Sequence, residues 1–206
     1  SMPDQALIHE ALARAEFVIV QEAFGHTETC AYADLLLPAT TWGEKEGTVT
    51  NSERAISRVR AAVSAPGEAR HDWAIVVDFA RRLGIRMGKA DLAAQMFPYT
   101  TPESIWNEHR ESTRGRDLDI TGLSYHLLEQ AGPQQWPFPE GASRGSVRLY
   151  EDGRFPTPSG KARFVVTEHR ITAESPDARY PLHLNSGRLR DQWHGMSRTG
   201  LVARLY

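Results

Sequence analysis

The chain has 206 residues, of which 40% are hydrophobic, enough for one large globular domain or for one domain and part of another. No apolar run approaches about 18 residues and no basic stretch precedes an apolar one at the N-terminus, so neither a membrane span nor a secretory signal is predicted. The net charge of −2, with both signs mixed along the chain, argues against a nucleic-acid-binding or basic membrane-binding surface.

The first 40 residues predict a helix followed by two strands. Ser1 to Asp4 resemble a helix start, and the apolar residues at 7, 11, 12 and 15 have helical spacing. Residues 17–20 form a short apolar run that ends at Gln21 and Glu22, and residues 35–37 form a second run stopped by Pro38. Such runs are typical of parallel strands covered on both faces, so we expect an α/β, Rossmann-like sheet.

Three further helices are expected in the middle of the chain. The clearest covers residues 72–83, with Trp73, Val76, Val77, Ala80 and Leu83 on one apolar face and Gly84 at its C-terminal stop. Thr101-Pro102-Glu103 indicates the start of a second helix, and residues 125–132 indicate a weaker third one.

The pattern changes towards β-structure after residue 132. Residues 147–155 predict a hairpin, and residues 162–166 and 182–184 alternate as strands do. A second domain is expected to begin near residue 176, although about 30 residues are too few for a core of their own. We therefore divide the chain into an α/β part with a β-rich connector, 1–175, and the beginning of another domain, 176–206.

Candidate binding residues follow the predicted strands and the main helix. Ligands bind beyond the carboxyl ends of strands in open α/β sheets, where Gln21 and Glu22 stand. The Glu22 carboxylate is suited to accept two N–H bonds from a guanine edge, but a solvated loop acid is the commoner role. Asp72 has a similar alternative, because it is expected to cap the helix that it precedes.

Two polar segments are candidate sites for phosphate or heterocycle binding. Residues 40–54 read TTWGEKEGTVTNSER, a loop able to present backbone N–H groups and the Lys45 ammonium, although composition alone favours a solvated charge run. Residues 184–200 read LNSGRLRDQWHGMSRTG and follow a predicted strand directly. Their glycines and arginines suit a phosphate or heterocycle, with an exposed basic loop as the alternative.

Other chemistry-bearing residues give weaker signals. Cys30 is the only cysteine, which excludes an internal disulfide, a Cys-rich zinc site and an iron–sulfur cluster ligated within the chain. It suits a reducing compartment, and we interpret it as a small, partly buried hydrophobe. His26 to Glu28 and Glu108-His109 lack the two-histidine spacing of a helical zinc site, and no phosphate-loop, GxGxxG or GxSxG motif occurs.

The longest motif gives a family resemblance. Residues 27–59, TETCAYADLLLPATTWGEKEGTVTNSERAISRV, are similar to the large α/β domain of bacterial molybdopterin oxidoreductases, which include formate dehydrogenases and nitrate reductases. The similarity continues through APGEARHDW, residues 65–73. It ends in residues 184–200, which resemble the start of that family's C-terminal dinucleotide-binding β-barrel.

The resemblance implies which residues bind the cofactor. It reverses the interpretation from composition, which favoured solvated surface charges at these positions. One guanine dinucleotide arm of a bis(molybdopterin guanine dinucleotide) molybdenum cofactor is implied to contact Gln21, Glu22, Lys45 and Asp72. A pterin arm is implied to contact Ser186, Gly187, Arg188, Leu189, Arg190, Asp191, Gln192, Trp193, His194 and Gly195. No metal ligand and no catalytic residue is implied within this chain.

Residues 115–141 most resemble cytoplasmic assimilatory nitrate reductases, which reduce nitrate to nitrite, with formate dehydrogenase as the rival. The resemblance implies that the family's N-terminal 4Fe-4S motif and its molybdenum-ligating cysteine belong to a region outside this sequence. The first strand of the α/β domain and most of the C-terminal barrel are also expected to lie outside it. We therefore expect an inactive, weakly binding or non-binding chain that needs the rest of its polypeptide and an electron-donor protein as partners. The alternative from another class is a non-enzymatic α/β interaction module.

Overall fold

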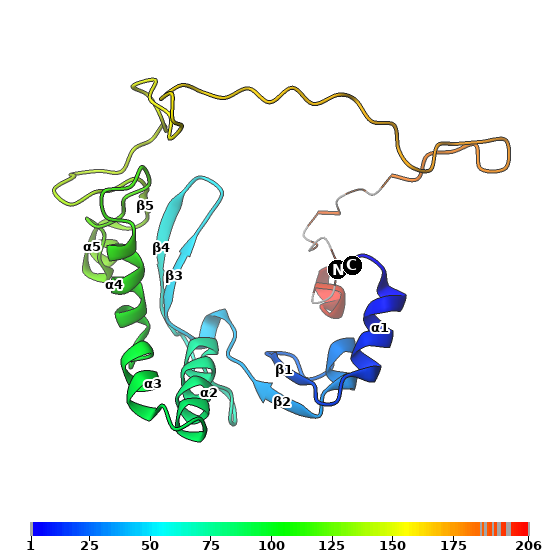
Figure 1. Ribbon diagram of the computed structural model, residues 1–206, viewed down its shortest axis with the longest axis horizontal. Helices are drawn as coiled ribbons and strands as arrows, with labels where there is room; N and C mark the ends of the chain where they lie inside the picture. Colours follow the sequence, from blue (N-terminus) through cyan, green and yellow to red (C-terminus); the bar gives the residue numbers. More distant parts are fainter. Residues whose placement is uncertain are drawn as a thin grey trace.

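The computed structural model describes residues 2–185, 187, 189–190, 192, 195–196 and 199–205. Helices and strands occupy residues up to 135, and two short 3-10 turns follow near the C-terminus (Figure 1). In chain order the elements are α1 (Gln5–Arg14), β1 (Ile19–Glu22), η1 (Glu28–Tyr32), β2 (Leu35–Pro38), η2 (Trp42–Glu44), β3 (Gly47–Thr50), β4 (Ala55–Val59), α2 (Asp72–Arg86), α3 (Ala90–Met96), α4 (Pro102–Ser112), α5 (Tyr125–Ala131), β5 (Gln134–Gln135), η3 (Thr199–Leu201) and η4 (Ala203–Leu205).

The N-terminal group of elements consists of α1, β1, η1 and β2. The Asp4 carboxylate caps α1 by accepting a hydrogen bond from the Leu7 backbone N–H at 3.2 Å. β1 and β2 pair in parallel, with Ile19 opposite Leu35 and Glu22 opposite Pro38. The predicted helix and the predicted parallel strands are confirmed, except that β1 begins two residues later and includes Gln21 and Glu22.

A second group packs β3, β4 and β5 against α4 and α5. β3 and β4 form an antiparallel hairpin and β5 adds to β4. The core of this group contains Ile56, Trp106 and Phe138 around the fully buried Leu123. Thr101 caps α4 through the Ser104 N–H, and the two predicted helices here are confirmed. Residues 40–54 are not one loop as predicted, because β3 and η2 lie within them.

α2 is longer than predicted and buries the predicted face only in part, with Val77 buried and Trp73 and Ala80 partly buried. It continues through Gly84 to Arg86, since Gly84 lies against Ala93 of α3 rather than ending the helix. Ile75 and Val77 are buried, whereas Val76 and Leu83 are 53% and 45% exposed. The prediction assumed that one apolar face of the helix packs against one core. In the structure α2 packs against α3, and another of its sides faces β1 and β2 across a hollow.

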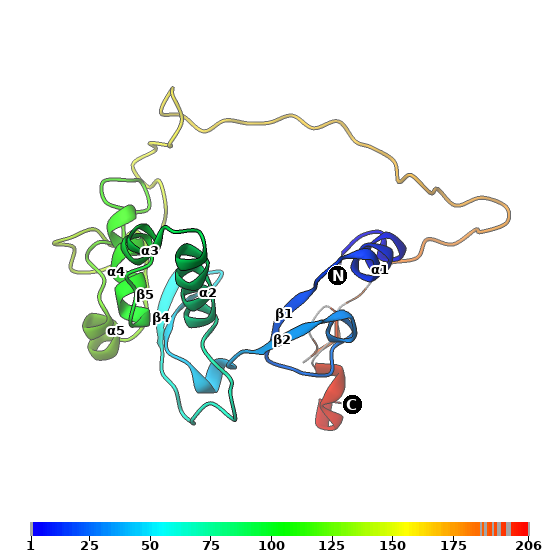
Figure 2. The same cartoon turned by 60° about the horizontal axis from the view of Figure 1, so that its bottom comes forward.

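The two groups meet at a narrow neck. Ala39 and Arg70 form an isolated parallel bridge, in which the Arg70 N–H donates to Pro38 O and the Thr40 N–H donates to Arg70 O, each at 3.0 Å. The chain thus leaves β2 at residue 39, forms β3 and β4, and returns beside its departure point before α2 begins. Figures 1 and 2 show the two groups on opposite sides of this neck.

Residues 136–185 are all described, and none of them lies in a strand. The predicted hairpin at 147–155 is replaced by turns, including one in which Gly153 N–H donates to Tyr150 O at 2.9 Å. The predicted strands at 162–166 and 182–184 are also wrong for this structure, because these segments are extended without a strand partner. Residues 162–166 form part of a long arm that runs clear of both groups, and the chain then returns towards α1 (Figure 2). The barrel start and the boundary at residue 176 stay predictions.

Candidate functional site

A cavity of about 440 Å³ opens where β1 and β2 end and α2 begins. Its position follows from the parallel pairing, because both strands present their carboxyl ends to the same edge. Both polar and apolar side chains line it. They are Gln21, Glu22, Ala23, Phe24, Ala39, Thr40, Thr41, Trp42, Lys45 and Asp72. The structure therefore brings together the four candidate residues that the sequence placed at separate positions, Gln21, Glu22, Lys45 and Asp72.

Asp72 lies at the first position of α2 and connects two other cavity residues. Its carboxylate accepts hydrogen bonds from Gln21 Nε2 at 2.8 Å and from Lys45 Nζ at 3.0 Å. Partial burial alone would raise the pKa of Asp72, but the hydrogen bonds from Lys45 and Gln21 and the charge of Lys45 hold this pKa below its ordinary value of 3.8. Asp72 does not cap α2, since the N-cap position belongs to His71.

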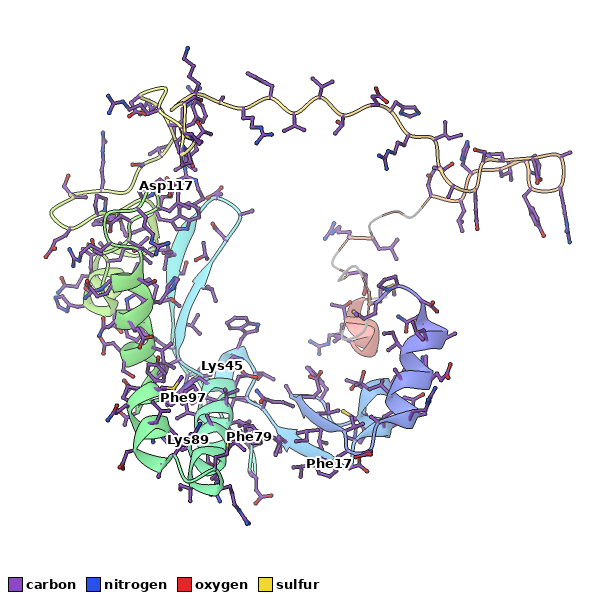
Figure 3. All side chains as sticks on the ribbon, viewed as in Figure 1. Phe17, Lys45, Phe79, Lys89, Phe97 and Asp117 are labelled. Atoms are coloured by element: carbon purple, nitrogen blue, oxygen red, sulfur yellow. The ribbon has the colours of Figure 1, made fainter. Side chains whose placement is uncertain are left out.

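Lys45 follows η2 directly and projects from the neck between the two groups of elements (Figure 3). A capping box fixes η2, in which the Glu44 carboxylate accepts from the Thr41 N–H at 2.8 Å. The Lys45 ammonium pairs with Asp72 and lies 5.0 Å from the centre of the Trp42 ring. The charge run Glu44-Lys45-Glu46 is therefore an ordered turn in which each charge has a different partner.

Glu22 is the last residue of β1, and its carboxylate accepts hydrogen bonds from the backbone that follows it. Its Oε1 atom accepts from the N–H groups of Ala23 at 2.8 Å and Phe24 at 3.3 Å. These contacts fix one carboxylate oxygen at the edge of the cavity. A negative charge is thus held at the end of β1, beside the ion pair of Lys45 and Asp72.

Thr40 and His71 tie the end of β2 to the start of α2. Thr40 is 3% exposed, and its Oγ1 atom lies 3.1 Å from Nδ1 of His71. This contact fixes the residue before Asp72 against the segment before Lys45. Sequence reasoning missed Thr40, His71 and Trp42, although the run Thr40-Thr41-Trp42 directly after a strand was the available signal.

The second predicted set, residues 186–195, is only partly described. Ser186, Arg188, Asp191, Trp193 and His194 lie outside the described residues. Of the described members Gly187, Leu189, Arg190, Gln192 and Gly195, none lines the cavity at Asp72. The contribution of this segment to cofactor binding stays a prediction.

Other chemical features of the described residues are limited. No group of three or more His, Cys, Asp or Glu side chains is arranged to hold a metal ion within the described part of the chain. Cys30 is half-buried and lies 3.1 Å from Thr27 Oγ1. No described helix is both long and apolar enough to cross a membrane.

Comparisons with known proteins give the family that this chain resembles. Residues 1–82 match the family model "Molybdopterin oxidoreductase". The whole chain is 39% identical over 209 residues to a nitrate reductase of Synechocystis, of which it covers 28%. The chain thus resembles the molybdopterin oxidoreductase family along its whole length. All four gathered residues lie within the matched segment, on β1, directly after η2 and on α2.

Other relatives carry two kinds of name. The chain is 39% identical over 191 residues to the assimilatory nitrate reductase catalytic subunit of Bacillus subtilis, a match covering 92% of this chain and 26% of that protein. It is 36% identical over 204 residues to the F420-dependent formate dehydrogenase subunit alpha of Methanocaldococcus jannaschii, covering 99% and 28%. The chain thus spans about a quarter of the length of these relatives.

One solved structure shares the fold. The acetylene hydratase of Pelobacter acetylenicus superposes with a TM-score of 0.51 and 22% sequence identity, over 77% of this chain and 19% of the hydratase chain. At this identity the likeness concerns the fold alone. It supports the mixed α/β architecture of this chain.

Proposed function

We propose that this chain forms one wall of the cofactor site in a molybdenum-dependent nitrate reductase of the assimilatory type. The observation that carries the proposal is the convergence of Gln21, Glu22, Lys45 and Asp72 on one cavity at the strand ends. These residues belong to β1, to the turn after η2 and to α2, so the fold alone brings them together. The cofactor is a bis(molybdopterin guanine dinucleotide), of which this cavity receives one guanine nucleotide arm.

The residues present fit such an arm in charge and in size. A guanine base offers N–H donors, for which the carboxylates of Glu22 and Asp72 are acceptors. A diphosphate needs cationic donors, and Lys45 supplies an ammonium in the same cavity. The volume of about 440 Å³ lies within the usual range of small-molecule sites, roughly 300–1,000 Å³.

The chain's own residues bind and orient in this proposal. The Lys45–Asp72 pair and the Gln21–Asp72 hydrogen bond hold the cavity walls in position before the ligand arrives, so less ordering is needed on binding. When bound, the molybdenum cofactor supplies the two-electron chemistry that reduces nitrate to nitrite. The redox centre lies outside these residues, and the isolated chain is inactive.

The proposed test removes the central ion pair in the intact enzyme. We expect Lys45→Ala/Asp72→Ala to lower the molybdenum and guanine content per protein several-fold, since both directional contacts of the cavity disappear. The matched control is Glu10→Ala/Arg14→Ala, which deletes an exposed ion pair of the same net charge in α1, 3.2 Å long. Unchanged cofactor content in the cavity variant would contradict the proposal.

Nitrate is favoured over formate by the names of the relatives and by the resemblance of residues 115–141 to assimilatory nitrate reductases. The second candidate function is formate oxidation, which the methanogen relative favours at 36% identity. Steady-state assays of the intact enzyme with nitrate and then with formate separate the two. Turnover of formate but not of nitrate would exclude nitrate reduction as the function.

The proposal includes partners beyond this chain. The remainder of the polypeptide supplies the 4Fe-4S cluster and the other half of the cofactor site, and an electron-donor protein or subunit delivers electrons in the cytoplasm. Metal analysis of the intact enzyme checks the cluster, with four irons expected for each molybdenum. Fractionation of the host cell checks the compartment.

A further inference from the structure

We propose that Trp42 is a base-stacking residue, whose indole forms a flat wall of the cavity for the guanine ring. This inference rests on the proposed function above and adds a residue to it. Trp42 lines the same cavity as Glu22, Lys45 and Asp72 and is 65% exposed. Tryptophan is highly buried on average, so an indole this exposed in a cavity offers a large flat surface to a ligand.

The local hydrogen bonds fix the backbone from which this indole projects. Trp42 is the first residue of η2, and the capping box of Thr41 and Glu44 closes that turn on both sides. Thr40, two residues earlier, is buried and contacts His71. An aromatic ring on such a fixed turn loses little conformational freedom when a ligand binds against it.

The contact with Lys45 accounts for only part of the indole surface. The ammonium lies 5.0 Å from the ring centre and also binds Asp72 at 3.0 Å. Trp42 therefore helps to position Lys45, yet most of its surface stays accessible. A planar base bearing N–H donors and an attached phosphate fits a cavity that combines an aromatic face, carboxylates and an ammonium.

Trp42→Ala, Trp42→Phe and Lys45→Met, together with the double variant Trp42→Ala/Lys45→Met, test the inference in the intact enzyme. The probe is GDP, titrated into the cofactor-free form by calorimetry, alongside the molybdenum content of the enzyme as purified. We expect Trp42→Ala to weaken GDP binding on the order of tenfold and Trp42→Phe by less than about threefold, because phenylalanine keeps a stacking face. Molybdenum content should fall in the same order.

The double variant separates stacking from the positioning of Lys45. Stacking predicts that Trp42→Ala still weakens GDP binding when Lys45 is already methionine, whereas loss of the effect in that background would overturn the inference. A lower melting temperature of the cofactor-free Trp42→Ala variant, with GDP binding and molybdenum content unchanged, would also overturn it, since the indole would then be covered by polypeptide.

The same variants distinguish this inference from the proposed function. If Lys45→Ala/Asp72→Ala loses cofactor while Trp42→Ala keeps it, stacking is wrong and the cofactor site stands. If Lys45→Ala/Asp72→Ala keeps its cofactor, the proposed function fails first.

Discussion

The carboxylate of Asp72 is the point at which three parts of the chain meet. It accepts from Gln21 at the end of β1 and from Lys45 after η2, while its own backbone begins α2. Because the pKa of Asp72 is lowered in the folded chain, the charged form stabilises the fold above the unfolded pKa of about 3.8. That contribution is lost as the pH falls through the lowered folded value.

Replacement of Lys45 by methionine should raise the pKa of Asp72. The variant keeps a side chain of similar length but removes a hydrogen bond and a positive charge, leaving the effect of partial burial, which raises the pKa. Carboxyl-carbon NMR titration measures the change, with Lys89→Met at the N-cap of α3 as the control. An Asp72 pKa that is the same with and without Lys45 would refute the assignment of the pair.

Arg54 has a structural role, because its side chain links two segments of the backbone. Its guanidinium donates to the backbone oxygens of Trp136, of Ser146 at 3.1 Å and of Val147 at 2.7 Å, and it lies over the Trp136 ring. Its backbone has a φ of 66°, a left-handed conformation that costs energy for arginine. The three contacts tie the loop after β5 to the β3–β4 turn.

We expect Arg54→Ala to destabilise the chain by about 1–3 kcal/mol, because the carbonyl oxygens lose a charged donor. Urea unfolding followed by tryptophan fluorescence measures the loss. Arg54→Gly relieves the backbone strain but lacks the contacts, so it should fall between the wild type and the alanine variant. Wild-type stability in the alanine variant would mean that the loop is held by other contacts.

At the scale of elements, the structures held by local interactions could be predicted from the sequence, whereas those held by distant contacts could not. The caps of α1 and α4 are local, so Ser1 to Asp4 and Thr101 mark helix starts in the sequence, although the N-cap of α1 is Asp4 and not the predicted Ser1. β3 and β4 escaped prediction because their stability depends on packing with α4 and α5, which are distant in sequence. The four binding candidates came from resemblance, since residue types alone favoured solvated charges.

Gly84 is an element-scale feature that local rules misread. A glycine after an apolar helical stripe predicts a helix end. In the structure it lies inside α2, and a Cβ atom built there would come within 2.3 Å of the Cβ of Ala93. The missing side chain allows α2 and α3 to approach closely, which single-sequence periodicity cannot indicate.

Gly84→Ala should therefore destabilise the α2–α3 pair by about 1–3 kcal/mol despite the better helix propensity of alanine. The control is Arg86→Ala at the end of α2. Equilibrium urea unfolding of both variants gives the comparison. A stabilised Gly84→Ala variant would show that the two helices separate at little cost.

At the scale of the whole molecule, much of the surface is open. The accessible area is 16552 Å², against about 9,700 Å² for a compact monomer of 23.1 kDa. Phe164, Val166 and Leu184 on the extended arm are each at least 85% exposed. Beside the neck, Phe17 and Phe79 border an apolar hollow of about 590 Å³ (Figure 3). The strands predicted at 162–166 and 182–184 need neighbouring strands, which the described residues of this chain do not provide.

Limited trypsin digestion of the chain should cut first after Lys161, Arg163 and Arg170. These residues lie on the exposed arm, where the backbone has no strand or helix partner. Arg58 and Arg110 should resist, because Arg58 is only 9% exposed and Arg110 donates to Leu123 O at 2.6 Å. Mass spectrometry of the early fragments decides, and initial cleavage at Arg58 or Arg110 would contradict this order.

The neck gives the binding cavity a mechanical role. Gln21 and Glu22 come from one side of the bridge between Ala39 and Arg70, whereas Lys45 and Asp72 come from the other. A ligand that contacts both pairs would act as a brace across this joint, because bending would cost the contacts that it loses on one side. Rigidity and occupancy would then be coupled, so that the proposed cofactor binding would stiffen the polypeptide at this joint.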